Sequence, residues 1–251
     1  MTEDPLEKFK RELVGRVNSY EKNQTLLKAR KEYLEELVKA KNAYNFFWLG
    51  VPIIQAPQDI QAMQEIIWEV KPDLIIETGV AWGGSILFSA SMLTILESCG
   101  LIEDGKVIGI DIEIRPHNKK TIGEHPLSSR LILLEGSSTD EKIVEQVKSV
   151  AKTKKSVMVI LDSNHTHDHV LSELKAYAPL VTKDSYVMVG DTGVEDLPEG
   201  STSDRAWGKG NNPKTAVWEF LKENKDFEID KLLESKLLIT GSPDGYLKRV
   251  H

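Results

Sequence analysis

Acidic and histidine side chains gather directly after one apolar segment of this chain. Residues 157–161 are apolar, Asp162 follows them, and three of the six histidines lie close behind at His165, His167 and His169. A lone histidine is usually structural, but three beside a carboxylate are difficult to explain by packing alone. Histidine exchanges a proton near neutral pH, so the cluster predicts acid–base or metal chemistry.

A second aspartate, Asp191, follows the apolar residues 186–189 in the same manner. If the two apolar segments are neighbouring parallel strands, Asp162 and Asp191 face one crevice. Paired carboxylate oxygens with room for water are typical of a Mg²⁺ site. We therefore predict that both aspartates are metal ligands.

A glycine-rich segment, residues 77–85, follows another apolar segment and suits a bound ligand. Its glycines let the backbone turn tightly and approach a ligand closely. A helix that begins there would offer free N–H groups to a carboxylate or phosphate, although a simple strand-to-helix turn has the same composition. The spacing of Gly79, Gly83 and Gly84 is not Gly-x-Gly-x-x-Gly, which argues against a dinucleotide.

Two more polar segments suit the ribose and the base of a bound nucleoside. Asp111 ends the apolar residues 107–111, where a carboxylate can accept hydrogen bonds from both ribose hydroxyls. Ser137 and Ser138 follow the next apolar segment, and such small side chains allow close passage over a flat base. A helix cap before Asp140 explains the same serines equally well.

All of these residues follow apolar segments, and a parallel sheet would bring them to one edge. Short apolar segments alternate with stretches of helical spacing, which predicts a mostly parallel sheet with helices on both faces. Ligands bind such sheets beyond the carboxyl ends of the strands. The expected strands are residues 74–77, 107–111, 131–134, 157–161 and 186–189, and the expected helices are residues 57–70, a segment ending near 96, 140–150, 167–177 and 214–221.

Two segments of the chain do not follow this alternation. Residues 236–240 and 246–250, on either side of a turn at 241–245, predict a terminal β-hairpin that adds an antiparallel strand to the sheet. Residues 46–54 are apolar but broken by glycine and proline, and they predict a buried connector.

The first 45 residues predict a helical arm, distinct from a body at residues 46–251. Apolar residues recur at steps of three and four, at Leu6, Phe9, Leu13, Val17 and Tyr20. Residues 1–44 carry ten Lys or Arg and eight Asp or Glu, a net charge of +2 that leaves −9 for the remainder. Because these charges alternate in sign, we expect the arm to pack on the body or on a second subunit. The alternative is a basic helix that binds an acidic partner or a membrane.

The composition excludes several classes of protein. With a net charge of −7 over 251 residues, a general nucleic-acid binder is not expected. No apolar run approaches the roughly 20 residues of a membrane helix. The single cysteine, Cys99, excludes intramolecular disulfides and zinc sites of four cysteines. The N-terminus has no apolar signal core, so we expect a cytoplasmic protein without a membrane span or a nucleic-acid partner.

Five motifs together resemble the cephalosporin hydroxylase / rhamnosyl O-methyltransferase family. They are residues 79–85, 109–118, 161–167, 208–213 and 243–246, and the resemblance covers about residues 44–250. The order of elements also resembles class I S-adenosylmethionine (SAM) methyltransferases, whose sheets have seven strands with the last antiparallel. The resemblance implies an α/β fold with a Rossmann-like, doubly wound, mostly parallel seven-stranded sheet and a C-terminal antiparallel hairpin.

The same resemblance implies the function and the site residues. It implies a SAM-dependent, Mg²⁺-assisted O-methyltransferase that acts on a hydroxyl of a small molecule, such as a sugar or a glycosylated natural product. The implied cofactor-binding residues are Glu77, Thr78, Gly79, Gly83 and Ser85 for the methionine part, Asp111 for the ribose, Ser137 and Ser138 beside the adenine, and Asp162. Similarity to catechol-type O-methyltransferases implies that Asp162 and Asp191 bind the metal and that His165 is the catalytic base, with Asp162 also catalytic.

The chain departs from the catechol-type pattern at one position. In that pattern an acidic pair or Asp-Asn follows the fifth strand, and its second member is absent here, because the neighbours of Asp191 are Gly190 and Thr192. The third ligand is then Thr192, Glu195 or Asp196, or it is missing.

Other interpretations of the chain stay open at this point. One is a nicotinamide-dependent oxidoreductase on a related sheet, and another is a non-catalytic binding subunit with the SAM fold. Trp207 and residues 208–212 either close over the substrate or form a surface loop. We expect a homo-oligomer that assembles through the N-terminal arm.

Overall fold

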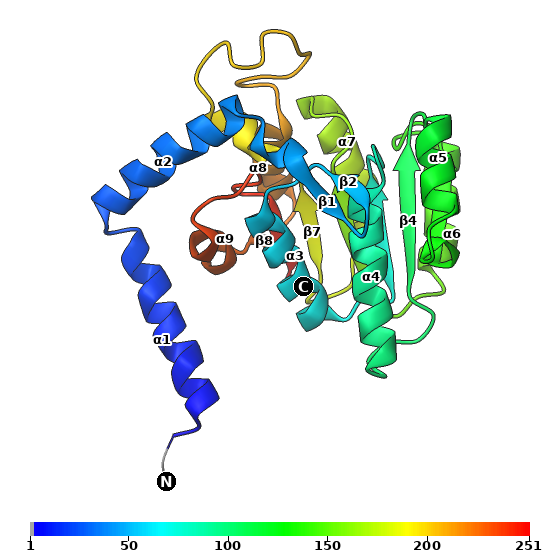
Figure 1. Ribbon diagram of the computed structural model, residues 1–251, viewed down its shortest axis with the longest axis horizontal. Helices are drawn as coiled ribbons and strands as arrows, with labels where there is room; N and C mark the ends of the chain where they lie inside the picture. Colours follow the sequence, from blue (N-terminus) through cyan, green and yellow to red (C-terminus); the bar gives the residue numbers. More distant parts are fainter. Residues whose placement is uncertain (1–2) are drawn as a thin grey trace.

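The centre of the molecule is a seven-stranded sheet in the order β5-β4-β3-β6-β7-β9-β8 (Figure 1). The computed structural model describes residues 3–251, so the first two residues of the expected arm lie outside the described part. The parallel strands are β3 (Leu74–Thr78), β4 (Lys106–Asp111), β5 (Leu131–Glu135), β6 (Val157–Leu161) and β7 (Tyr186–Val189). The antiparallel strand β9 (Tyr246–Arg249) pairs with both β7 and β8 (Phe227–Ile229). The predicted Rossmann-like, doubly wound sheet is confirmed.

Helices cover both faces of the sheet, and this explains why the strands are continuously apolar. One face packs against α6 (Glu141–Ala151), α7 (His167–Tyr177) and α8 (Pro213–Glu223), and the other against α3 (Pro57–Val70), α4 (Gly84–Ser98), α5 (Pro116–Gly123) and α9 (Lys231–Leu237). Along β6, Val157 and Val159 belong to the first core while Met158 and Ile160 belong to the second. Alternate side chains therefore fill two separate hydrophobic cores.

The strand order reverses at β3, which has β4 on one side and β6 on the other. Thr78 pairs with Ile110 and with Leu161, and Leu161 pairs with Val189, so these strands end level with one another. Such a reversal leaves a crevice beyond the carboxyl ends of the strands. The predicted site residues that follow β3, β4, β6 and β7 are thus brought to one edge.

The C-terminal antiparallel strands are present, but the predicted position of the first one is wrong. Residues 231–237 form helix α9, and the partner of β9 is β8 instead of residues 236–240. The Asp230 side chain accepts a hydrogen bond from Leu233 N and so caps the helix. Leu233 is buried, and Leu237, four residues later, packs against the same core. This spacing is helical, and it overrides the apolar run that suggested a strand.

The predicted buried connector is also corrected, because residues 46–53 form a small antiparallel hairpin. Its strands are β1 (Phe46–Trp48) and β2 (Val51–Ile53), and they turn at Leu49 and Gly50, both with positive φ. Pro52 O and Ile53 lie so close to Gly84 that any Cβ at this residue would overlap them. The hairpin therefore packs directly on the start of α4.

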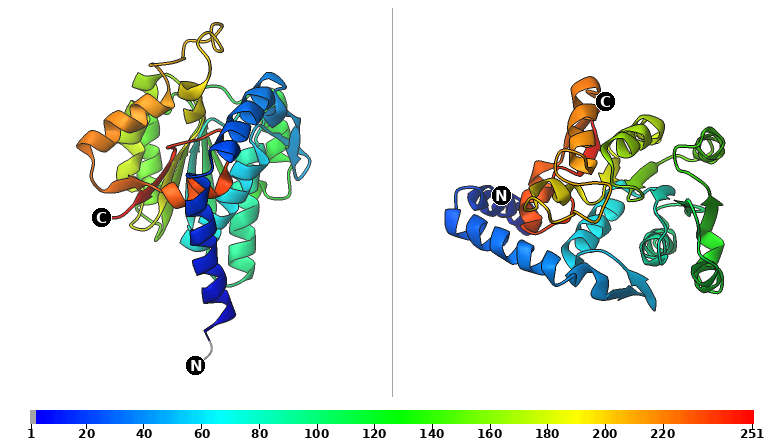
Figure 2. Two further views of the ribbon diagram at one scale, coloured as in Figure 1. Left: turned by 90° about the vertical axis from the view of Figure 1, so that its left-hand side faces the viewer. Right: turned by 90° about the horizontal axis from the view of Figure 1, so that it is seen from above.

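The N-terminal segment consists of two helices, α1 (Pro5–Tyr20) and α2 (Gln24–Lys39), which project from the body (Figure 2). Val17 is buried where α1 packs against α9, but Leu6 and Phe9 are 58% and 55% exposed. The helical arm is thus present, while its division from the body as a separate domain stays a prediction. In the described part of the chain, no helix combines the length and the apolar character that a membrane crossing requires.

Candidate active site

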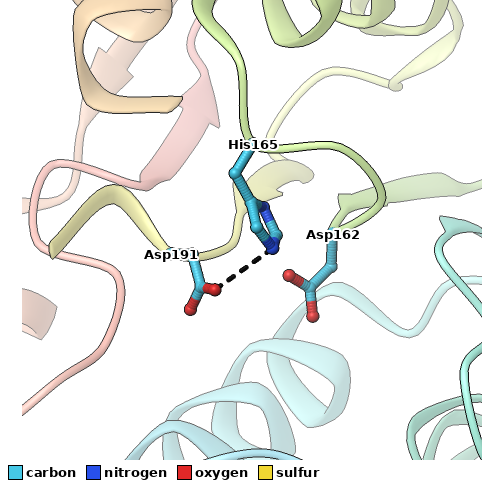
Figure 3. Close-up of side chains that lie close together, drawn as sticks. All are labelled: Asp162, His165 and Asp191. Carbon is cyan, nitrogen blue, oxygen red and sulfur yellow. Dashed lines mark ion pairs between the residues drawn. The ribbon is translucent and has the colours of Figure 1, made fainter. Parts of the chain in front are cut away.

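Asp162, His165 and Asp191 lie together at the carboxyl edge of the sheet (Figure 3). Asp162 directly follows β6, His165 comes from the loop before α7, and Asp191 follows β7 by two residues. One potential ligand atom from each residue lies within 4.8 Å of the others. His165 Nε2 is 3.2 Å from Asp191 Oδ2. The strand order brings together residues that are 29 positions apart in the chain.

Two glycines make room for Asp162. A Cβ at Gly190 would overlap Asp162 Oδ1, and a Cβ at Gly79 would overlap the backbone carbonyl of Asp162. Gly79 also has a φ of +90°, a conformation that strongly favours glycine. Both residues therefore need to be glycine for Asp162 to occupy its present position.

The electrostatics of this cluster fit a bound cation. Burial raises the pKa of Asp162 well above its ordinary value, and the negative charges of Asp191 and Glu77 raise it further. A divalent cation between the two aspartates would offset this repulsion. Carboxylate oxygens suit Mg²⁺, whereas imidazole nitrogen suits softer metals, so His165 is better placed to accept a proton than to ligate Mg²⁺.

None of the three candidates for a third protein ligand joins the cluster. Thr192 Oγ1 donates to Pro243 O at 2.6 Å, Glu195 accepts from Gly210 N at 2.8 Å, and Asp196 accepts from Lys214 Nζ at 2.7 Å. Among the described residues, the cluster contains Asp162, His165 and Asp191 alone. Mg²⁺ commonly keeps several waters, so two carboxylates are compatible with a site.

The cofactor loop after β3 is built around a buried carboxylate. Glu77 is 1% exposed, one of its oxygens accepts the Ser85 hydroxyl, and its Oε2 has no partner in the described protein. Thr78 is buried beside it, and Gly83 (φ +94°) leads into α4. Glu77 therefore holds the first turn of α4 through its bond with Ser85.

We expect Glu77 to give the metal-free protein a distinctive dependence of stability on pH. Burial raises its pKa from 4.5 to about 7. The folded state holds this proton more tightly than the unfolded state, so the stability it contributes is complete below pH 4.5 and is lost as pH rises through 7. Glu77→Gln should gain about 3 kcal/mol relative to the wild type between pH 5 and pH 8. Urea unfolding at several pH values measures this, with Glu135→Gln at an exposed site as the control. Parallel stability curves for wild type and Glu77→Gln would contradict it.

Asp111, the predicted ribose ligand, also holds the cofactor loop. Its Oδ2 accepts from Val80 N at 2.9 Å and from Ala81 N at 3.1 Å. Its Oδ1 accepts only a longer bond from Glu113 N, at 3.3 Å, which leaves acceptor capacity for a hydroxyl. Asn118, whose Nδ2 donates to Ala81 O at 2.7 Å, fixes the same loop. Nothing in the spacing of Asn118 indicated this contact.

Ser138 is partnered inside the protein, whereas Ser137 is more open. The Ser138 hydroxyl is 3.1 Å from His169 Nε2, and the same nitrogen is 3.2 Å from Ser163 Oγ. Ser137 Oγ lies 3.0 Å from Thr139 Oγ1. His169 thus joins the loop after β5 to the loop after β6, away from the aspartate pair.

His167 has a structural position as well. Its Nδ1 is 2.8 Å from Thr215 Oγ1, and its Nε2 is 3.3 Å from Glu219, so it links α7 to α8. Of the three clustered histidines, His165 alone reaches the aspartates. Its ring contacts Trp207 edge to face at 4.8 Å between centroids, and Arg205 lies over the Trp207 ring. The Trp207 segment therefore packs against the site.

The strand order, the crevice at the reversal and the loop after β3 define the Rossmann-like fold of SAM-dependent methyltransferases. A family model described as "Rhamnosyl O-methyltransferase/CmcI" matches residues 40–250. The chain belongs to this family, and it is a SAM-dependent O-methyltransferase.

The similar proteins agree with this assignment. Rhamnosyl O-methyltransferase of Mycobacterium tuberculosis is 29% identical over 221 residues, which cover 87% of this chain and 82% of that protein. The Mycobacterium leprae protein of the same name is 28% identical over 204 residues, with 80% and 82% covered.

Solved structures share the fold. Apo CmcI has a TM-score of 0.57 at 19% identity, and the match covers 83% of this chain and 77% of CmcI. A CmcI structure titled with Mg and SAM has a TM-score of 0.55 at 19% identity, and the match covers 83% of this chain and 78% of that one. Apo CalS11, a TDP-rhamnose 3'-O-methyltransferase, has a TM-score of 0.53 at 16% identity and covers 99% and 96%.

Proposed function

We propose that this protein methylates a hydroxyl of a sugar or of a glycosylated natural product, with Mg²⁺ held by Asp162 and Asp191. The observation that carries the proposal is the clustering of Asp162, His165 and Asp191 within 4.8 Å at the crevice. The relatives support it, because they are named rhamnosyl O-methyltransferases and one CmcI structure is titled with Mg and SAM.

The cofactor residues fit SAM by position and by chemistry. SAM supplies a methyl group that is activated by a positively charged sulfur. Gly79, Gly83 and Ser85 would surround its methionine part, Asp111 Oδ1 keeps acceptor capacity for the ribose, and Ser137 would lie beside the adenine. A cationic cofactor would favour the ionised form of Asp162, whose pKa burial raises in the free protein. The main contribution of the protein is to hold the hydroxyl, the methyl group and the sulfur in line.

The residues at the crevice can also activate the hydroxyl. Mg²⁺, when bound, lowers the pKa of a hydroxyl and orients it. His165 Nε2 faces both aspartates and can accept the proton of the acceptor hydroxyl. Trp207, in contact with the His165 ring, limits access of water to the same atoms.

Calorimetry with SAM and with NAD⁺ tests the cofactor. We expect SAM to bind and NAD⁺ not to bind, since the dinucleotide glycine pattern is absent. Binding of NAD⁺ without SAM would favour an oxidoreductase. Binding of SAM without turnover of any rhamnose-bearing acceptor would mean that the acceptor hydroxyl belongs to another sugar or small molecule.

Metal removal tests the second part of the proposal. We expect EDTA to abolish methyl transfer and excess Mg²⁺ to restore it, because the aspartate pair alone repels the electron-rich acceptor. Transfer of radiolabelled methyl groups measures this directly. Undiminished turnover in EDTA would mean that His165 acts without a metal.

The exposed face of the arm supports assembly with a second copy of the chain. Leu6 and Phe9 are largely exposed on α1, and the arm is net positive while the remainder is net negative. We expect Leu6→Ser with Phe9→Ser to reduce the mass in light scattering to that of a monomer. A cytoplasmic location and the lack of a nucleic-acid partner stay predictions.

A further inference from the structure

The turn at residues 241–245, between α9 and β9, lies beside the loop that carries Asp191. Gly193 N donates to Gly241 O at 3.0 Å, and Val189 N donates to Gly245 O at 2.8 Å. The Thr192 hydroxyl donates to Pro243 O at 2.6 Å. The turn therefore holds the chain on both sides of Asp191.

Asp191 benefits from such support because its backbone is in a sparsely populated conformation. Its φ is +52°, in the left-handed region, which aspartate adopts more readily than most side chains but less readily than glycine. Strained residues persist where the surrounding structure determines them fully, and they gather at functional sites. Thr192 is completely buried, so its hydroxyl has no water as an alternative partner. The bond to Pro243 O thus fixes the orientation of the residue that follows Asp191.

The turn is itself anchored to α3 by a buried carboxylate. Asp59 is 4% exposed, its Oδ1 accepts the Tyr246 hydroxyl at 2.8 Å, and its Oδ2 accepts Gly241 N at 2.9 Å. Burial raises the pKa of Asp59, so the group is costly to keep in the core. An apolar side chain would fill this space at a lower free-energy cost. It would not, however, hold the two ends of the turn by hydrogen bonds.

We propose that Asp59, Tyr246 and Thr192 are positioning residues that set the geometry of the metal-binding site by fixing Asp191 through the turn at residues 241–245. Their side-chain oxygens bond within the protein, to the turn and to one another. The inference rests on the proposed function, because it presumes that Asp191 binds a cation. It also gives a role to residues 243–246, which otherwise only mark the family.

Mn²⁺ binding to the cofactor-free protein, followed by electron paramagnetic resonance, tests the proposal without an activity readout. Residues that orient ligands typically change metal affinity by about 10- to 100-fold. We expect Tyr246→Phe and Thr192→Val each to weaken Mn²⁺ binding by about tenfold. Thr192→Ser keeps the hydroxyl and should retain wild-type affinity.

Tyr186→Phe is the matched control. Tyr186 is also buried, and its hydroxyl donates to Asp230 at 2.8 Å. Asp230 N donates in turn to Tyr246 O at 2.9 Å, so this variant disturbs the same region without removing the bond to Asp59. It should lower the melting temperature as Tyr246→Phe does, while Mn²⁺ affinity stays at the wild-type value. If Tyr246→Phe fails to fold, the comparison of Thr192→Val with Thr192→Ser still decides.

Two results would overturn the inference. One is wild-type Mn²⁺ affinity in both Tyr246→Phe and Thr192→Val. The other is an equal loss of affinity in Tyr186→Phe, which would indicate a general loss of stability. If the wild-type protein itself binds no Mn²⁺, the metal part of the proposed function fails, and the positioning role fails with it.

Discussion

Replacing Asp162 by asparagine should lower kcat by about a thousandfold and at the same time raise the melting temperature of the metal-free protein. The loss follows because one of the two carboxylates that face the crevice is removed from the proposed metal site. The gain follows because burial and neighbouring carboxylates raise the pKa of Asp162. With a raised pKa in the folded state, the stability from this group is complete only below its ordinary pKa and is lost as pH rises. At neutral pH the ionisable carboxyl of Asp162 therefore destabilises the fold, and asparagine removes this cost.

Methyl transfer and thermal unfolding of the same preparation measure both effects. Asp168→Asn is the matched control, since Asp168 is exposed in the first turn of the neighbouring helix α7. A folded Asp162→Asn protein with undiminished turnover would refute the catalytic role. A lower melting temperature would refute the electrostatic argument.

Replacing His165 by glutamine should lower kcat by about 10²- to 10⁴-fold, the range that a positioned general base contributes. Glutamine keeps a polar side chain beside Asp191 but cannot accept a proton near neutral pH. The remaining rate should rise steadily with pH, because hydroxide then replaces the imidazole. The wild-type rate should instead level off above the pKa of the catalytic base.

His167→Gln separates this role from a structural one. His167 lies two residues away but links α7 to α8 through Thr215 and Glu219. Its replacement should lower the melting temperature with little change in kcat. Equal losses of kcat in the two variants would mean that the loop as a whole, and not the His165 nitrogen, supports turnover.

The edge of the sheet on which the site forms was predictable, because continuously apolar segments mark where the strands end. Asp111, Asp162 and Asp191 each follow a continuously apolar segment, and parallel strands place such residues at one edge. Residues 236–240 misled the prediction because a short apolar run fits a strand or a buried helix equally well.

The residues that support the site were not predictable from spacing. Asp59 is far from Tyr246 along the chain, and the two meet only because α3 packs beside the C-terminal strand. Thr192 was a candidate ligand by its proximity to Asp191, yet its hydroxyl points to the turn at residues 241–245. Long-range packing decides such contacts, and no local pattern encodes it.

The absent side chain at residue 190 restricts how the site can change. An acidic residue there would place a second carboxylate directly beside Asp191 in the chain. Every substitution at this position, however, introduces a Cβ that overlaps the carboxylate of Asp162. An acidic substitution at residue 190 therefore cannot add a ligand while the Asp162 carboxylate keeps its present position. Adding a ligand at this position would first require moving the Asp162 carboxylate.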